Sequence, residues 1–403
     1  MLEITAEGEG FVRNILRNGT IFSFGCFYRS HRHPARSRGA AEVILDLVKA
    51  LAADGMRVAL IVGRTDKPQT DLDGFCREFG IELYRAPRLL REVSPVDDFL
   101  AFLAIRRIIG AIHPAIVHTH TSKAGIIGRF AAWSAGIKHI VHSPRGHIFY
   151  GYYGRATTLF FVMLERLAAG ITEAITTLTE KEKRDYIEKG IGPEKKFAVV
   201  HSGVDVKLFA QGDGSRIRHE TGFADALVVG WAGRLDPEKN CLLFIEAASM
   251  VHTRLPYVRF VVAGDGEEHA VVRERAGTLG LADFIRFLGN RNDMPDVMAA
   301  FDVFVLSSRN EGFGRVLVEA MAAGAVPVAT RVGGTVDVIE DTVSGLLVQP
   351  GDPGALADAV CLLLEDEELR SRLRENGRKQ AERFTIHAMV QKFEDLYAKL
   401  LHS

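Results

Sequence analysis

The stretch from Val303 to Thr330, VFVLSSRNEGFGRVLVEAMAAGAVPVAT, contains the pattern from which the fold can be predicted. Residues 303–306 and 326–330 are apolar runs of strand length, too short for buried helices. Between them, residues 314–323 contain no helix breaker after Gly314. A strand, a helix and a second strand in this order form the crossover unit of a parallel sheet.

The same alternation continues on both sides of this unit. It predicts a helix from residue 39 whose buried face holds Val43, Ile44, Leu47, Val48 and Leu51, and a helix that begins at Asp352-Pro353. Further strands are expected at residues 20–24, 56–62, 115–118 and 139–142, and again at 227–231, 258–263 and 284–288. The pattern pauses in a polar stretch that ends near Asp225. We therefore expect an α/β protein with two doubly wound, Rossmann-like domains, residues 1–202 and 203–383, and a closing amphipathic helix over residues 384–401.

Length and composition agree with two globular domains. The chain has 403 residues, of which 47% are hydrophobic and 25% charged. Its four cysteines are scattered, which favours a reducing, cytoplasmic setting. No apolar run is long enough to span a bilayer, and the acidic first residues are unlike an export signal.

Charge is divided unevenly along the chain. Residues 1–200 carry 28 Lys+Arg against 21 Asp+Glu, and no acid lies between Asp98 and Glu165. This excess indicates that the first domain meets an anionic partner, or that it merely balances the acidic second half. The basic residues are spread and form no nucleic-acid motif, so we expect no nucleic acid as a partner.

Two loops of the second half contain candidate ligands for a diphosphate and its sugar. The loop at residues 307–313 precedes a helix start, where Gly312 and Gly314 allow close approach of a phosphate to free backbone amides. Glu311 in the loop and Glu319 on the helix can accept sugar hydroxyls, although each could also be an ordinary helix acid. Arg234 and Lys239 follow the expected strand at 227–231 and can offset the charge of a leaving diphosphate.

At these motifs the sequence resembles a known family. GRLDPEKN, EGFGRVLVEAMAAGAVPVATRVGG and HSGVDVKLF are similar to the nucleotide-sugar-dependent retaining glycosyltransferases of family 4, which have the two-domain GT-B fold. The resemblance implies that Glu311 contacts the donor sugar, Glu319 the nucleotide ribose, and Arg234 and Lys239 the diphosphate. Phe313 belongs to the same glycine loop and is expected beside the donor.

The resemblance further implies that Phe287 lies beside the nucleotide base. It also implies that the two domains face each other across a cleft and that the last helix crosses back to the first domain. It implies a UDP- or GDP-sugar donor and no bound metal or other cofactor. A role in cell-surface polysaccharide or lipopolysaccharide synthesis is expected at the cytoplasmic face of a membrane. There the enzyme is expected to be cytoplasmic or peripherally bound through its first domain.

Residues of the first domain are candidates for acceptor binding. His118, His120 and Lys123 follow an expected strand, and the two histidines could instead be buried, hydrogen-bonded strand residues. Gly39 and Ala40 occupy the family's glycine-rich loop, with Ala40 in place of its second glycine.

The segment after the strand at 139–142 departs from the family. Arg145 stands where many relatives have a histidine against the donor sugar, so His147 could take the catalytic role and Arg145 could bind a phosphate. The aromatic residues that follow could meet a lipid-linked acceptor or pack in the core: Phe149, Tyr150, Tyr152 and Tyr153.

Other interpretations remain open. AGDGEEH at residues 263–269 follows an expected strand but lacks the third glycine of the dinucleotide fingerprint, which weakens a dehydrogenase assignment. A nucleotide-sugar epimerase or hydrolase on the same fold, or a non-catalytic sugar-nucleotide-binding protein, would share the donor motifs. Asp71 and Asp73 spell an acid pair that holds metal in a different transferase fold, but we expect a polar loop there.

Overall fold

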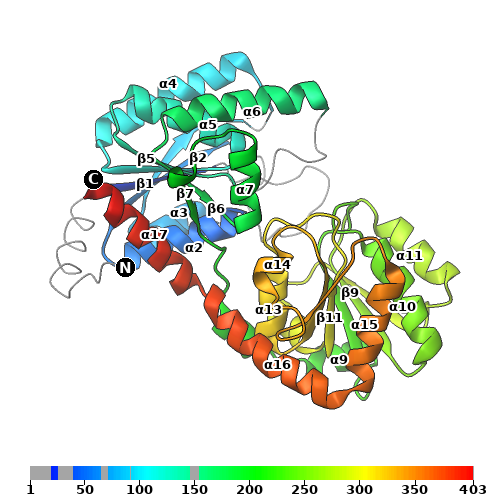
Figure 1. Ribbon diagram of the computed structural model, residues 1–403. Helices are drawn as coiled ribbons and strands as arrows, with labels where there is room; N and C mark the ends of the chain where they lie inside the picture. Colours follow the sequence, from blue (N-terminus) through cyan, green and yellow to red (C-terminus); the bar gives the residue numbers. More distant parts are fainter. Residues whose placement is uncertain (1–19, 26–39, 65–70, 91, 146–153, 403) are drawn as a thin grey trace. The chain divides into compact units, whose positions relative to one another are not determined.

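The computed structural model describes residues 20–25, 40–64, 71–90, 92–145 and 154–402. The chain forms two compact units, which divide between His201 and Ser202. Residues 387–402 return to the first unit, and residues 202–386 form the second. Each unit contains one parallel sheet with helices packed on it (Figure 1), which confirms the predicted α/β class.

The first sheet has seven strands in the order β3-β2-β1-β4-β5-β6-β7. Their bounds are β1 Thr20–Gly25, β2 Arg57–Gly63, β3 Glu82–Ala86, β4 Ile116–His120, β5 His139–Ser143, β6 Ala174–Thr177 and β7 Phe197–Val199. Strand order reverses between β1 and β4, and ligands of such sheets bind outside the carboxyl ends of the strands near this point.

Helices cover both faces of this sheet. Their bounds are α2 Ala40–Ala53, α3 Leu72–Glu78, α4 Pro95–Ile112, α5 Ser122–Ser134, α6 Arg155–Gly170, α7 Glu180–Glu188 and α17 Ile386–Leu401, with a 3-10 turn at Glu194–Lys196. Figure 1 shows α4, α5 and α6 in one layer and α2 and α3 on the opposite side of the sheet. The predicted buried face of α2 is confirmed, because each of its five apolar residues is at most 2% exposed.

The acid pair Asp71 and Asp73 lies at a helix start, so the prediction of a polar loop there is wrong. The Asp71 carboxylate caps α3 by accepting a hydrogen bond from the Gly74 backbone N–H at 2.9 Å. Asp73 forms an ion pair with Arg85 at 2.5 Å. A capping Asp with an acid in the first turn is a local stabilising arrangement.

The second sheet has six strands in the order β10-β9-β8-β11-β12-β13. Their bounds are β8 Val228–Ala232, β9 Arg259–Ala263, β10 Ile285–Gly289, β11 Val303–Leu306, β12 Val326–Thr330 and β13 Leu346–Val348. The strands of the opening sequence unit, β11 and β12, have the predicted bounds and pair in parallel. Order reverses between β8 and β11, which places a second switch point beside the loops that carry the donor motifs.

The helices of the second unit follow the predicted alternation. Their bounds are α8 Val206–Ala210, α9 Ser215–Thr221, α10 Cys241–Arg254, α11 His269–Thr278, α12 Met294–Ala299, α13 Arg315–Ala323, α14 Thr335–Val338, α15 Pro353–Glu365 and α16 Glu367–Ala381, with a 3-10 turn at Glu382–Phe384. Asp352 caps α15 as predicted, since its side chain accepts a hydrogen bond from the Ala355 N–H at 2.9 Å. The core beneath these helices contains Trp231 and Phe244, which are almost fully buried.

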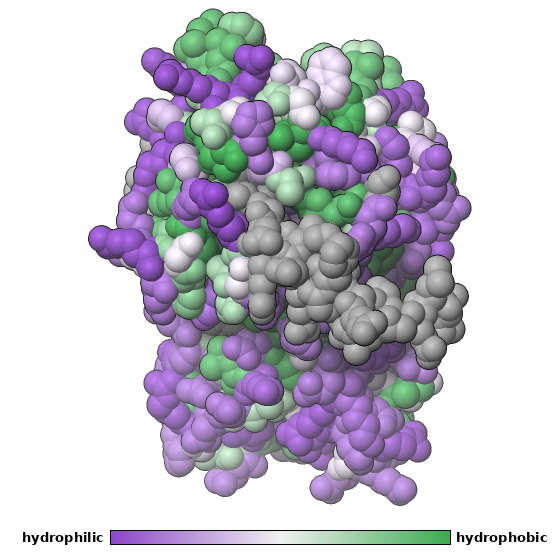
Figure 2. All heavy atoms as spheres, turned by 90° about the vertical axis from the view of Figure 1, so that its left-hand side faces the viewer, coloured by the Kyte–Doolittle hydropathy of each residue, from purple (hydrophilic) through white to green (hydrophobic). Residues whose placement is uncertain are grey.

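Hydrophobic side chains also reach the surface. Figure 2 shows hydrophobic side chains gathered at the top of the view, in the part of the first unit where Figure 1 draws α4, α5 and α6. This surface belongs to the first unit alone.

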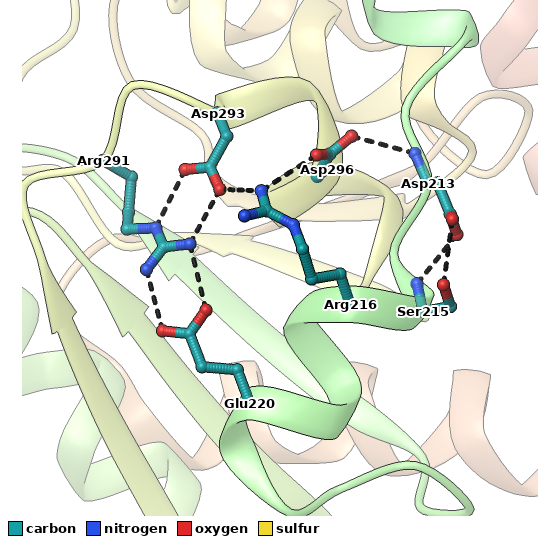
Figure 3. A network of polar contacts seen from close by, with 7 residues as sticks. All are labelled: Asp213, Ser215, Arg216, Glu220, Arg291, Asp293 and Asp296. Carbon is teal, nitrogen blue, oxygen red and sulfur yellow. Dashed lines mark hydrogen bonds and ion pairs between the residues drawn. The ribbon is translucent and has the colours of Figure 1, made fainter.

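A network of ion pairs connects α9 to the loop before α12 (Figure 3). The Arg291 guanidinium donates to Glu220 at 2.8 and 3.1 Å and to Asp293 at 2.9 and 2.7 Å. Arg216 contacts Asp293 and Asp296. Because Arg291 donates to two carboxylates from a half-buried position, this network holds two elements in register better than a lone surface pair would.

We expect Arg291→Ala to lower the free energy of unfolding of the second unit by about 1–2 kcal/mol at neutral pH, since two carboxylates lose their shared partner. Hydrogen bonding from Arg291 lowers the pKa of Asp293 below its ordinary 3.8. The contribution of the Arg291–Asp293 pair to the free energy of unfolding is therefore fully present above pH 3.8. It is lost as the pH falls through the lowered pKa of Asp293. Chemical unfolding at several pH values measures this. A difference that persists unchanged below pH 3 would contradict the electrostatic explanation.

Candidate active site

Loops that follow strands of the second sheet meet at its carboxyl edge. Backbone hydrogen bonds join them: the Arg309 N–H donates to the Glu238 carbonyl at 2.8 Å, and the Gly334 N–H to the Glu311 carbonyl at 2.9 Å. Backbone hydrogen bonds thus tie the loops after β8, β11 and β12 to one another. A rigid backbone at this edge preorganises whatever site the loops form.

Two glycines permit the closest of these approaches. A Cβ on Gly333 would lie 1.8 Å from the Glu311 carbonyl oxygen, and one on Gly264 would lie 1.8 Å from the Gly233 carbonyl oxygen. Both residues also have positive φ angles, of 49° and 131°. Only glycine fits such positions, so the loop carrying Glu311 is fixed by backbone contact.

The structure brings Lys239 and Glu311 together. The Lys239 ammonium donates to the Glu311 carboxylate at 2.5 Å, and the Ser308 hydroxyl donates to the same oxygen at 3.2 Å. The two charged side chains remain 23% and 10% exposed, so both can still be reached by a ligand. A cation and a carboxylate one hydrogen bond apart can bind a phosphate and a sugar hydroxyl of one molecule.

Arg234 lies nearby in the same loop as Lys239 but is held differently. Its side chain is exposed and forms an ion pair with Asp236 at 2.9 Å. The Asp236 carboxylate also accepts a hydrogen bond from the Lys239 backbone N–H at 2.9 Å. Asp236 therefore holds the Arg234 side chain and the backbone of Lys239.

The start of α13 has the form expected of an anion-binding helix terminus. Gly314 precedes the helix in the left-handed region at φ 84° and, as the N-cap residue, has no side chain that could cap the first turn. Gly312 is half-buried, and Glu319 on the helix is 6% exposed. Free amides at the end of a helix favour a phosphate.

The two aromatic residues predicted near the donor differ in position. The Phe313 ring is 3% exposed and packs on Phe384 at 5.5 Å between centroids, so the ring belongs to the core. Phe287 on β10 is half-buried, with its ring 5.3 Å from the Arg273 guanidinium and 6.2 Å from the His269 ring. The Phe287 ring is the more accessible of the two.

In the first unit, His118 and His120 lie inside the core. The His118 ring contacts the Tyr397 hydroxyl and the Ser143 hydroxyl, each at 2.7 Å, and neither histidine is exposed. Burial lowers the pKa of both well below the ordinary value. Their burial favours the alternative of core residues for both side chains, and the His118 ring is hydrogen-bonded there.

The remaining predicted site residues of the first unit lie in different surroundings, and two of them fall outside the described residues. Lys123 is held at the start of α5 by the Asp98 carboxylate and the Glu92 carbonyl. Arg145 follows β5 with φ 60°, half-buried, and its guanidinium lies 5.8 Å from the Phe393 ring centre. Ala40 is the first residue of α2, whereas Gly39 and His147 lie outside the described residues.

Sequence reasoning missed Glu182, a carboxyl group buried beside this cluster. One of its oxygens accepts a hydrogen bond from the Leu178 N–H at 2.6 Å, and the other has no hydrogen-bond partner among the described residues. Burial raises the pKa of Glu182 to about 7. The Thr179-x-x-Glu182 spacing of a capping box could have identified it, because Thr179 caps α7.

Near pH 8 we expect Glu182→Gln to raise the free energy of unfolding by about 1–3 kcal/mol, because it removes a buried charge while keeping a carbonyl acceptor for Leu178. With a folded pKa of about 7 against an ordinary 4.5, the folded protein binds the extra proton between these values. The gain should therefore grow from pH 4.5 to 7 and vanish below 4.5. Glu188→Gln, exposed on the same helix, is the control, and an equal gain there would refute the assignment.

The described parts of the chain contain no group of three or more His, Cys, Asp or Glu side chains that could hold a metal ion. Nor do those parts include a helix with the length and apolar character required to cross a bilayer.

Family models match both units. The model described as Glycosyl transferase 4-like domain matches residues 38–203, and the model described as Glycosyl transferases group 1 matches residues 215–380. The second match contains all the donor-site candidates from Arg234 to Glu319.

Curated relatives extend over most of the chain. The UDP-Gal:alpha-D-GlcNAc-diphosphoundecaprenol alpha-1,3-galactosyltransferase of Escherichia coli is 29% identical over 348 residues, covering 83% of this chain and 90% of that protein. A D-inositol 3-phosphate glycosyltransferase of Salinispora arenicola is 30% identical over 313 residues, covering 71% of this chain and 69% of that protein.

Solved structures share the fold. HepE of Anabaena, in complex with UDP and glucose, superposes with a TM-score of 0.75 at 21% identity, covering 94% of this chain and 100% of that one. WaaG, a glycosyltransferase involved in lipopolysaccharide biosynthesis, superposes with a TM-score of 0.70 at 18% identity, covering 94% and 99%. Together with the sequence matches, these likenesses show that the chain belongs to the group 1 glycosyltransferases of family 4, which have the GT-B fold.

Proposed function

We propose that this glycosyltransferase moves a sugar from a UDP- or GDP-linked donor to a hydroxyl of a lipid-linked glycan, with retention of the anomeric configuration. The observation that carries the proposal is the pairing of Lys239 with Glu311 at 2.5 Å, in the loops that lead to α13 and its N-cap residue Gly314. These groups supply a cation and amides for the diphosphate, and a carboxylate for the sugar hydroxyls. A relative described as the capsular polysaccharide biosynthesis glycosyltransferase CapM of Staphylococcus aureus supports a role in polysaccharide synthesis.

The leaving nucleotide departs as a diphosphate, and charge develops on its bridging oxygen. Lys239, Arg234 and the first amides of α13 are the groups that we assign to stabilising this charge. With protein cations in that role we propose that transfer requires no bound metal. Addition of a chelator should then leave the rate unchanged.

Retention is proposed to occur by attack on the same face as the leaving group. The acceptor hydroxyl gives its proton to the departing phosphate oxygen while its own oxygen bonds to the anomeric carbon. We assign Glu311 to the hydroxyls of the sugar and not to a covalent intermediate. NMR of the product anomeric centre tests this: a product with inverted configuration overturns the mechanism.

The acceptor is proposed to be a sugar carried on a lipid diphosphate, at the cytoplasmic face of a membrane. The support is the Escherichia coli relative named above, whose own acceptor is a diphosphoundecaprenol-linked sugar. A panel of nucleotide-sugars, assayed by released nucleotide with and without a lipid-linked diphosphate sugar, tests the proposal. Release that does not depend on acceptor would instead indicate a hydrolase, and no release with any donor would favour a binding protein.

A further inference from the structure

The outer faces of α4 and α6 expose hydrophobic side chains. On α4 these are Val96, Phe99, Leu100 and Leu103, which are 39–71% exposed, and on α6 they are Leu159, Phe160, Met163 and Leu167, which are 50–67% exposed. Single exposed apolar residues are ordinary, but eight on two helices of one layer are not.

Each helix is apolar on both sides, so packing against the sheet does not explain the outer residues. In α4 the buried positions Ala101, Ile105 and Ile109 face inward. The exposed residues recur at spacings of three and four on the other side of the helix, which makes a separate stripe. In α6, Val162 and Ala169 are buried while the four exposed residues form the outer stripe.

The two stripes belong to the same side of the first unit. Figure 1 draws α4 and α6 in one layer with α5, and α5 packs against both. At the top of its view, Figure 2 shows hydrophobic residues in two clusters with hydrophilic residues beside them. Helices of a parallel sheet begin at the carboxyl edge of the strands. The apolar positions near the starts of α4 and α6 therefore lie toward the edge that carries Ser143 and Arg145.

Basic residues outnumber acidic ones in the segment that carries these stripes. No Asp or Glu lies between Asp98 and Glu165 in the sequence. The acids that bound this segment are neutralised, Asp98 by Lys123 and Glu165 by a buried ion pair with Arg129 at 2.7 Å. Beyond the apolar stripe of α4, Arg106 and Arg107 are exposed, as is Lys138 after α5.

We propose that this α4–α6 face docks on an anionic lipid bilayer. Its apolar side chains would enter the boundary between headgroups and acyl chains while the basic residues lie among anionic headgroups. The proposal rests on the proposed function, since a lipid-linked acceptor must be reached at a membrane surface. A second copy of this chain is a poorer occupant, because two such faces would oppose arginine to arginine.

The test is co-sedimentation of the full chain with vesicles of phosphatidylcholine alone and of phosphatidylcholine with one third phosphatidylglycerol. We expect binding to the anionic vesicles and a loss of roughly tenfold in the partition coefficient for Phe99→Ser with Phe160→Ser. Arg107→Gln with Lys138→Gln should weaken binding severalfold, with less dependence on salt. The matched control is Tyr257→Ser with Val271→Ser, two residues of the second unit that are each 52% exposed.

Nucleotide release with a short-chain, water-soluble acceptor separates this proposal from the proposed function. The Phe99 and Phe160 variant should keep that rate and lose only the rate with acceptor in vesicles. Unchanged vesicle binding by this variant, or no binding by the unaltered chain, overturns the docking surface. Light scattering without vesicles completes the test: a dimer that the double variant converts to a monomer would assign the face to a second copy and overturn the proposal.

Discussion

Lys239→Ala should lower kcat for sugar transfer by about 10²–10³-fold, the equivalent of roughly 3–4 kcal/mol of transition-state stabilisation. Lys239 donates to Glu311 at 2.5 Å and is 23% exposed, so its charge is held in position beside the proposed diphosphate site. Removing one fixed charge at a departing phosphate has a large effect because water that replaces it must reorient as the charge develops. Steady-state kinetics at saturating donor and acceptor measures the loss.

The control for this substitution is Lys207→Ala. Lys207 is exposed on α8 of the same unit, so the change alters net charge equally. The midpoint of thermal unfolding should move by only a few degrees in Lys239→Ala, because Glu311 keeps its hydrogen bond from Ser308. A rate within threefold of the unaltered enzyme would remove Lys239 from the site.

Gly333→Ala should destabilise the second unit by about 3 kcal/mol or more, which corresponds to roughly 6 °C or more in its unfolding midpoint. The new Cβ would lie 1.8 Å from the Glu311 carbonyl oxygen, so the two loops must separate. Sugar transfer should fall at least as much as in Lys239→Ala, since displacement of Glu311 disturbs both members of the pair. Thermal unfolding and steady-state kinetics provide the two measurements.

Gly351→Ala separates the clash from the strain of a positive φ. Gly351 has φ 80°, but a Cβ there meets nothing within 4 Å. Its replacement should cost only about 1 kcal/mol and leave the rate unchanged. Equal effects of the two alanine substitutions would show that backbone contact at Gly333 does not hold the Glu311 loop.

The positions of most strands in both sheets could be predicted because each buried strand corresponds to a short apolar run in the sequence. Strands β11 and β12 have the predicted bounds, and Asp352 caps α15 as its spacing to Pro353 indicated. The loop position of Glu311 and the helix position of Glu319 were predictable for the same reason: a strand end and the next helix start are local signals.

Side-chain pairings across the chain could not be predicted, because no local pattern encodes them. Lys239 and Glu311 are separated by 72 residues, and His118 and Tyr397 by 279. His118 reads equally well as a ligand or as a core residue until the segment that covers it is known. The helix start at Asp71 was missed for a different reason, since its polar residues also fit a turn.

The position of α17 has a consequence for how the protein is made. Tyr397 covers His118, yet it follows the whole second unit in sequence. During synthesis the amino-terminal sheet therefore emerges before the helix that covers His118, because residues 202–386 are made between them. The first unit can therefore complete its core only after the second unit has been synthesised, although its sheet is made first.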